Sequence, residues 1–261
     1  MKKKYFFCFF ILMLFLAGCA KETSEKADNK AQDRSLLNVK ERGKLLVGTN
    51  LPYAPMEYYD ESGKMVGLDI DLINNIASEM GVSVEILDAP WESLFDDVKS
   101  GKFDVIIDTI TITQQRREEM LFSAPYFNAE QAIMMLADKE EVKRLEDLKG
   151  KKIGVQKETT GEKTAQQYLV SSSIEGYGVW TQAIPDLKTG KIDAILVDNS
   201  AGLIAVKNDP TLKLYGGLFT QEYYGIATKL GNDALMGEID KILREIKRTG
   251  KLDEMKKKWL Y

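Results

Sequence analysis

The 261-residue sequence contains no histidine, and this absence removes several classes of active site. Without histidine the chain has no Ser-His or Cys-His nucleophilic pair and no His-ligated metal centre. Carboxylate and lysine chemistry stay possible. We accordingly expect neither a metal site nor a cofactor.

Cysteine and long basic runs are also scarce. The only two cysteines are Cys8 and Cys19, so the chain beyond residue 19 cannot form a disulfide within itself. The formal net charge is −4 and there is no long basic run, which makes nucleic acid an unsuitable partner.

What the first 19 residues do contain indicates export. Three lysines at positions 2–4 precede an apolar run over 6–16, followed by the sequence Leu-Ala-Gly-Cys at 16–19. The run is short for a membrane span and is typical of a signal peptide. The ending resembles a bacterial lipoprotein box, which implies cleavage before Cys19 and lipidation of its thiol, for example with palmitate. An ordinary signal peptide or an N-terminal anchor is the alternative.

Removal of residues 1–18 would take away three lysines and change the formal net charge from −4 to −7. The next stretch, up to residue 35, has no aromatic and no large aliphatic side chain, so it cannot bury enough apolar surface to order itself. We expect residues 19–35 to be a flexible tether. The part from Leu36 onward is long enough for one large domain or two small ones.

In that part, short β-rich runs alternate with helical patterns. The strand candidates are residues 44–49, 82–87, 103–108, 151–155 and 192–197. A helix is predicted from the apolar spacing in DIDLINNIASEMG, with Asp69 or Asp71 at its start and Gly81 as its stop. This alternation predicts an α/β fold with largely parallel sheets.

One segment is repeated within the chain. The stretches DVKSGKFDVIIDT (97–109) and DLKTGKIDAILVD (186–198) align without a gap and share six identities in thirteen. Coincidence is one explanation, since helix-Gly-strand is a common unit. The other is two lobes of like topology. Thr109 and Asp198 would then lie at equivalent strand ends, where open α/β sheets bind ligands.

Several motifs together resemble the extracellular solute-binding proteins of amino-acid ABC transporters. They are GTNLPYAPMEY (48–58), GLDIDL (67–72), TITITQQRR (109–117), FSAPYF (122–127), GVQKETTGE (154–162), ILVD (195–198), YYGIAT (223–228) and GKLDEMKKKW (250–259). The resemblance implies the type II periplasmic-binding-protein fold, with two α/β lobes joined by two hinge strands. Lobe 1 would comprise 36–129 plus 226–261 and lobe 2 would comprise 130–225, with the chain crossing between them near 128–135 and 222–228.

A bound α-amino acid brings a carboxylate and an ammonium, and each needs a partner once water is excluded. By the resemblance, Arg116 binds the carboxylate, together with Thr111 and with Thr160 at a helix start capped by Thr159 and Glu162. A solvated arginine and an ordinary helix cap are the structural alternatives, and Arg117 is expected to be solvated. Glu158 stands where the family usually has glycine, so this loop could differ.

For the ammonium, the resemblance nominates Asp198, the carbonyl of Thr109 and the hydroxyl of Thr111. A helix cap is the structural alternative for Asp198. For the ligand's side chain, it nominates four residues: Asn50, Tyr53, Trp91 and Val197. Trp91 is either a lid over the cleft or a core residue.

Asn50 and Asp108 give opposite indications about that side chain. Asn50 stands where relatives often carry aspartate, which argues against a cationic ligand side chain. Asp108 stands where the family tends to have a small residue. It could face the cleft and accept a second amine or an amide, or turn away and bind local backbone.

The expected function is that of a monomeric receptor, lipid-anchored on the extracytoplasmic face of the cell membrane. It would bind a polar L-amino acid between two closing lobes and deliver it to the permease of an ABC importer. A periplasmic enzyme of the dehydratase type on the same fold is one alternative, since it needs a cleft carboxylic acid with a raised pKa. A sensory or adhesion lipoprotein is another.

Overall fold

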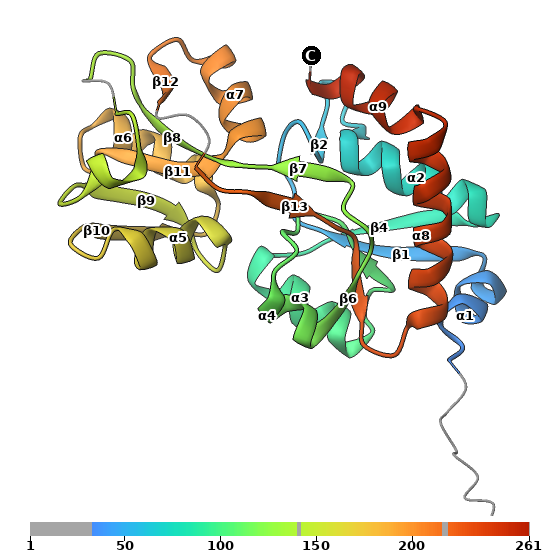
Figure 1. Ribbon diagram of the computed structural model, residues 1–261. Helices are drawn as coiled ribbons and strands as arrows, with labels where there is room; N and C mark the ends of the chain where they lie inside the picture. The colour runs from blue at the N-terminus through green and yellow to red at the C-terminus, as the bar shows by residue number, and fades with distance from the viewer. Residues whose placement is uncertain (1–32, 140–141, 216–218, 261) are drawn as a thin grey trace, which may run out of the picture. The chain divides into compact units, whose positions relative to one another are not determined.

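The computed structural model describes residues 33–139, 142–215 and 219–260 (Figure 1). The predicted signal peptide over 1–18, the lipidation site at Cys19 and most of the predicted tether lie outside these residues. Within the described part, no helix is both long enough and apolar enough to cross a membrane.

The first sheet has five strands in the order β4-β1-β5-β14-β6. The strands are β1 (Lys44–Thr49), β4 (Ser83–Asp88), β5 (Val105–Ile106), β6 (Met120–Phe122) and β14 (Ala227–Lys229). β4 and β5 run parallel to β1, whereas β14 runs antiparallel to both β5 and β6.

The second sheet repeats this arrangement, in the order β10-β9-β11-β8-β12. Its strands are β8 (Gln131–Leu136), β9 (Lys152–Gln156), β10 (Ser173–Tyr177), β11 (Ala194–Asp198) and β12 (Leu212–Tyr215). β10 and β11 run parallel to β9, and β8 runs antiparallel to β11 and β12. The like topology of the two sheets agrees with the repeat in the sequence.

The prediction of largely parallel sheets was only partly right, because both sheets are mixed. β14 and β8 are the strands by which the chain enters each sheet from the other one, and both enter against the direction of their neighbours. β5 is also much shorter than the predicted 103–108. The chain leaves the ladder after Ile106 and reaches a left-handed backbone conformation at Thr109, where φ is 50°.

Two short strands carry the chain between the sheets, β7 (Phe127–Ala129) and β13 (Glu222–Tyr224), and they pair antiparallel with one another (Figure 1). The first crossing ends earlier than the predicted residue 135, since residues from Gln131 onward already pair with β11. A further two-stranded ribbon is formed by β2 (Tyr58–Tyr59) and β3 (Met65–Val66).

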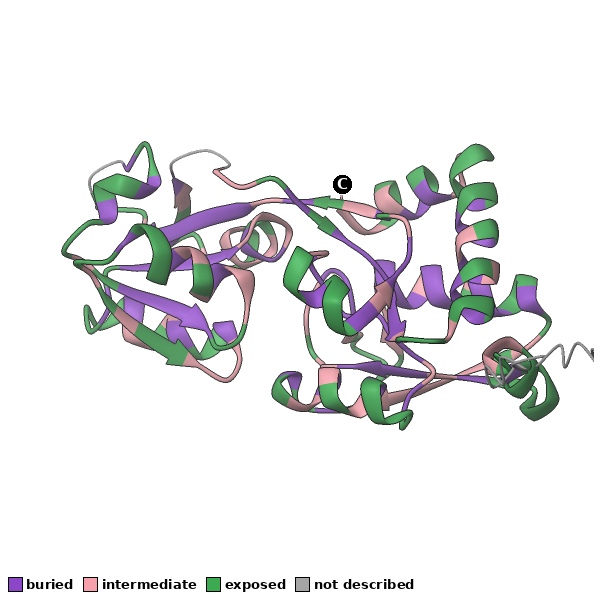
Figure 2. Ribbon diagram, turned by 60° about the horizontal axis from the view of Figure 1, so that its bottom comes forward, coloured by how far each residue is buried: buried purple, intermediate pink, exposed green. Residues whose placement is uncertain are grey.

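Helices cover the sheets, and their apolar faces are buried while the opposite faces are exposed (Figure 2). The α-helices are α1 (Ser35–Arg42), α2 (Leu68–Met80), α3 (Trp91–Ser100), α4 (Gln114–Glu119), α5 (Thr160–Tyr168), α6 (Ala183–Lys188), α7 (Asn199–Asn208), α8 (Asp233–Arg248) and α9 (Lys251–Leu260). Two short 3₁₀ helices span Leu145–Leu148 and Trp180–Gln182.

Helix α2 ends at Gly81 as predicted, and it begins at Leu68, so that Asp69 and Asp71 lie in its first turn as expected. Gly67 occupies the N-cap position, and neither Asp69 nor Asp71 caps the helix. Asp69 lies inside the first turn with no exposed surface. It is held there by long-range hydrogen bonds that helix periodicity does not reveal: its carboxylate accepts from the Thr109 N–H and the Tyr126 hydroxyl.

Candidate functional site

A cavity lies between the carboxyl ends of β5 and β11, with about 520 Å³ of empty space when the adjoining open solvent is included. All ten residues nominated for ligand contacts line it: Asn50, Tyr53, Trp91, Asp108, Thr109, Thr111, Arg116, Thr160, Val197 and Asp198. The lining also includes Gln131, Gln156, Thr159, Trp180 and Leu196. The structure thus brings the nominated residues together, and the role of each remains a prediction.

Arg116 lies buried on α4, with 8% of its surface exposed. Its backbone N–H is held by the N-cap Thr113, and its guanidinium donates to the Thr111 carbonyl at 2.9 Å. The guanidinium carbon lies 4.8 Å from the ring centre of Phe95 and 5.6 Å from that of Trp91, within cation–π range. Its neighbour Arg117 is exposed, as expected for a solvated residue.

No carboxylate forms an ion pair with Arg116 in the described residues. Burial lowers the pKa of its guanidinium to about 10, against the opposing fields of Glu222 and Asp198. The group is still charged at neutral pH. A buried cation without an adjacent anion is costly, which makes this position suited to an anionic ligand group.

Glu222, on β13, joins the two threonines that were nominated for the carboxylate. One of its oxygens accepts the Thr111 hydroxyl at 2.8 Å and the Thr160 hydroxyl at 2.7 Å. Because each hydroxyl has one proton, neither can donate to a ligand while this arrangement lasts. Their backbone N–H groups and the α5 N-terminus remain as donors for a carboxylate.

The start of α5 is capped by Thr159, whose hydroxyl accepts the Glu162 N–H at 3.2 Å. The reciprocal bond of a capping box does not form, because the Glu162 carboxylate accepts from the Glu158 N–H instead, at 2.6 Å. Glu158 has φ of 61°, the left-handed conformation that glycine adopts most easily. The loop therefore keeps a glycine-like backbone in spite of the substitution.

Asp198 ends β11, where its side chain does not cap α7. Its carboxylate accepts from the hydroxyls of Tyr53 and Tyr224 and from the amide of Gln131. Burial raises the pKa of Asp198 to about 6, although the Tyr224 hydrogen bond counteracts the shift. All three donors are neutral, so the negative charge has no cation directly beside it.

Trp91 is both a core residue and part of the cavity wall. It is 6% exposed, packs edge-on against Phe95 at 5.1 Å between ring centres, and belongs to the cluster beneath β5. Its indole N–H is buried with no acceptor in the described residues. Val197 is likewise buried and pairs with Ala132 of β8.

Asp108 lines the cavity and is 3% exposed. One carboxylate oxygen accepts from the Asn50 N–H at 3.1 Å and from the Thr49 hydroxyl at 3.3 Å. The sequence left two orientations open, towards the cleft or towards local backbone, and the side chain does both. Thr109 follows in a left-handed conformation that costs a β-branched residue about 1–3 kcal/mol.

Sequence reasoning missed Glu222, Gln131 and Tyr224, which surround the nominated threonines and Asp198. All three lie on or beside the crossing strands, where the only available signal was a polar residue in a short β-rich run. Across the described residues, no group of three or more acidic or cysteine side chains is arranged to hold a metal ion.

Comparison with known proteins places this arrangement in a family. Residues 45–261 match the model of the bacterial extracellular solute-binding proteins, family 3. The L-cystine-binding protein TcyJ of Escherichia coli K12 is 33% identical over 230 residues, covering 87% of this chain and 86% of its own.

Two solved structures extend the comparison. An ancestral arginine-binding protein bound to arginine is 39% identical, with a TM-score of 0.81 over 84% of this chain and 99% of its own. The ancestral amino acid-binding protein AncCDT-1, a precursor of cyclohexadienyl dehydratase, is 31% identical, with a TM-score of 0.82 over 87% of this chain and all of its own. With its two like sheets, two crossing strands and matching sequence over 45–261, the chain belongs to the bacterial extracellular solute-binding proteins of family 3.

Proposed function

We propose that this protein is the extracytoplasmic receptor of an ABC importer and binds a polar L-amino acid in the cavity between β5 and β11. Arg116, the Thr111 N–H and the start of α5 at Thr160 bind the ligand's carboxylate. Asp198 and the Thr109 carbonyl bind its ammonium. Relatives named for binding L-cystine, glutamine and arginine support an amino-acid ligand.

The observation that carries this proposal is the pair of buried charges without direct counterions, Arg116 and Asp198. A zwitterionic head group supplies both missing partners at once. A dicarboxylate without an amine would match Arg116 and repel Asp198, whereas a simple cation would do the reverse.

The experiment is calorimetry of the purified, unfolded and refolded protein against the twenty amino acids and L-cystine. We expect a dissociation constant near micromolar for at least one of them, about −8 kcal/mol, which allows both capture and release. Absence of binding below about 1 mM for all of them would contradict the proposal.

The variant Arg116→Ala should lose at least 100-fold in affinity for that ligand, since one partner of a desolvated charge pair contributes about 2–5 kcal/mol. Arg117→Ala is the matched control, because it removes the same charge one residue away from an exposed position. Its affinity should stay within two-fold of the wild type. Equal losses in both variants would show that Arg116 does not bind the ligand's carboxylate.

We further propose that Cys19 carries the lipid anchor and that residues 19–35 separate the receptor from the membrane. This rests on the signal-like residues 1–18 and the Leu-Ala-Gly-Cys ending. Cys19→Ala expressed in a bacterial host should move the protein from the membrane fraction to the soluble exported fraction, whereas Cys8→Ala should not. Membrane retention of Cys19→Ala would contradict lipid anchoring.

The enzyme alternative has one feature in its favour. Burial raises the pKa of Asp108 to about 7, as a general acid in a dehydratase would need. The relatives with a named role are transport binding proteins, and even AncCDT-1 is described as an amino acid-binding protein. We therefore favour a receptor over an enzyme.

A further inference from the structure

Three acidic side chains meet behind the end of β5: Glu57, Asp69 and Asp108. Glu57 and Asp69 have no exposed surface and Asp108 is 3% exposed. They come from three separate segments, the loop before β2, the first turn of α2 and the chain just after β5. None of them forms an ion pair with a lysine or arginine of the described chain.

The polar partners of the two aspartates are all neutral. Asp69 accepts at one oxygen from the Thr109 N–H at 3.1 Å and from the Tyr126 hydroxyl at 2.7 Å. Asp108 accepts at Oδ1 from Asn50 and Thr49, as described above. Its other oxygen, Oδ2, accepts no hydrogen bond from the described residues and is not among the fully buried atoms without a partner. It is therefore accessible from the cavity that Asp108 lines.

Three further carboxyl oxygens of the cluster have no hydrogen-bond partner among the described residues. They are both oxygens of Glu57 and the Oδ1 of Asp69, and all three are buried. Burial, followed by the charges of Asp108 and Asp69, raises the pKa of Glu57 well above its ordinary value. Glu57 therefore favours its neutral form more strongly than an exposed glutamate does.

The two aspartates titrate closer to neutrality. Burial is the largest cause for both, raising the pKa of Asp108 to about 7 and that of Asp69 to about 6. The titratable groups that face Asp108 are Glu57, Asp69 and the hydroxyls of Tyr53 and Tyr126. The pKa values of both tyrosines are raised well above 10, so the tyrosines stay neutral. Arg116 lines the same cavity, but among the described residues no lysine or arginine forms an ion pair with Asp108. A negative charge therefore builds up beside the cavity without a counterion.

We propose that Asp108 binds the end of the ligand's side chain, and that the ligand is an α-amino acid whose side chain carries a second positive charge. This inference rests on the proposed function, in which Arg116 and Asp198 already take the zwitterionic head group. Asp108 then supplies the one carboxylate of the cavity that the head group leaves free.

The surroundings of Asp108 suit such a cation. The aromatic side chains of Tyr53 and Trp91 line the same cavity, and aromatic faces attract guanidinium and ammonium groups. Asn50 donates its side-chain N–H to the Ala89 carbonyl at 2.9 Å, which leaves its amide oxygen as an acceptor. Asn50 lacks the carboxylate that relatives often have at this position, but its backbone N–H binds the carboxylate of Asp108. Asp108 can therefore supply the negative charge that Asn50 does not.

Proton release should accompany the binding of such a ligand. A cation beside Asp108 favours its charged form and lowers its pKa in the complex. Below about pH 7 the free protein holds the proton, so affinity for a cationic side chain should rise with pH. The ionised fraction of a group with pKa about 7 changes about 30-fold between pH 5.5 and 8, and the affinity should change by the same factor.

The test is calorimetry of the full chain with two matched pairs, L-arginine with L-citrulline and L-lysine with L-norleucine, at pH 5.5 and pH 8. Both members of a pair have the same α-ammonium and α-carboxylate groups, but only the first member has a positively charged side chain. We expect at least one charged member to bind at least 30-fold more tightly than its neutral partner at pH 8, and this preference to shrink at pH 5.5. At pH 6.5, buffers of different ionisation enthalpy should reveal release of about 0.8 proton per bound cation.

The variant Asp108→Asn should abolish both the preference and its pH dependence. Asp88→Asn is the control, because Asp88 ends the neighbouring strand β4, is exposed and does not line the cavity, yet loses the same charge. The inference is wrong if the charged members bind no more tightly than the neutral ones, or if Asp108→Asn keeps the preference. If no α-amino acid binds at all, the proposed function itself has failed.

Discussion

The two copies of the repeated segment, residues 97–109 and 186–198, share their supporting contacts and differ at their last two positions. In both, a lysine after the glycine pairs with the aspartate that begins the segment, Lys102 with Asp97 and Lys191 with Asp186, each at 2.7 Å. The final positions are Asp108–Thr109 in one copy and Val197–Asp198 in the other. The scaffold is thus duplicated, whereas the ligand-facing chemistry is not.

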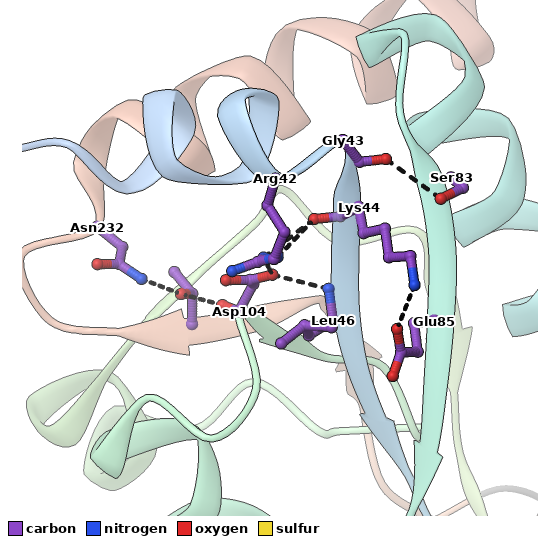
Figure 3. A network of polar contacts seen from close by, with 9 residues as sticks. Arg42, Gly43, Lys44, Leu46, Ser83, Glu85, Asp104 and Asn232 are labelled. Carbon is purple, nitrogen blue, oxygen red and sulfur yellow. Dashed lines mark hydrogen bonds and ion pairs between the residues drawn. The ribbon is translucent and has the colours of Figure 1, made fainter.

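The shared contacts extend into each sheet. Asp104 accepts the Leu46 N–H of β1 at 2.7 Å (Figure 3), and its equivalent Asp193 accepts the Lys152 N–H of β9 at 2.8 Å. A Cβ on Gly48 would lie 2.3 Å from the ring of Phe103, and one on Gly154 would lie 2.6 Å from Ile192. Both glycines are therefore needed so that the residue after the lysine can pack on the neighbouring strand.

The difference at the strand ends concerns where each carboxylate finds its partners. Asp198 accepts from Tyr53 in the loop after β1, from Gln131 of its own sheet and from Tyr224 of the crossing strand β13. Asp108, one position earlier in the repeat, is held by its own sheet and backed by Glu57. The chain leaves the ladder after Ile106 at the end of β5, whereas β11 continues to Asp198. The same scaffold therefore gives two carboxylates with different surroundings, which we propose to be two different subsites.

The largest expected effect separates these two subsites. Asp198→Asn should reduce the affinity for every α-amino acid by at least 100-fold, since the ammonium loses its only charged partner, worth about 2–5 kcal/mol. Asp108→Asn should reduce only the affinity for ligands with a positively charged side chain. Calorimetry with L-arginine and L-citrulline measures both, and the comparison fails if the two variants have the same ligand profile.

A second effect concerns the pH dependence of stability. The pKa values of Asp69, Asp108 and Asp198 are raised to about 6, 7 and 6, above an ordinary value of 3.8. The folded chain therefore binds more protons than the unfolded chain between pH 4 and 7, and the free energy of unfolding falls as pH rises through this window.

Urea unfolding without ligand should accordingly give a protein that is more stable at pH 5.5 than at pH 8, by about 2 kcal/mol or more. Asp108→Asn should remove more of this difference than Asp198→Asn, because the pKa of Asp108 is raised further. A wild-type protein that is more stable at pH 8 than at pH 5.5 would contradict the raised pKa values of these three aspartates.

The smallest effect tests the shared scaffold. Asp104→Ala should lower the free energy of unfolding by about 1–3 kcal/mol, because it leaves the partly buried Leu46 N–H without its side-chain acceptor and removes the ion pair with Arg42. Asp193→Ala removes the equivalent bond at a more exposed site, and its effect should be smaller. Thermal and urea unfolding of both variants provide the measurement. A larger loss of stability for Asp193→Ala than for Asp104→Ala would contradict this comparison of the two positions.

Much of the fold could be predicted from local pattern. The β-rich runs at 44–49, 151–155 and 192–197 lie within two residues of the observed strands, because apolar runs bounded by turn residues reflect burial directly. The start of α2 was predicted to within one residue, but the sequence did not reveal that Asp69 is a buried acceptor and not a helix cap. The length of β5 was overestimated for a related reason, since the backbone departs from the ladder where Asp108 and Thr109 enter the cavity.

The sequence by itself determined the family, the repeated segment and ten of the residues that line the cavity, since these follow from motifs that are visible along one chain. Only the tertiary structure decided that Glu222 joins Thr111 to Thr160 and that Glu57 and Asp69 lie behind Asp108. The physical reason is desolvation. A carboxyl group's charge depends on which distant segments remove its water and which donors they bring, and the folded packing alone sets both.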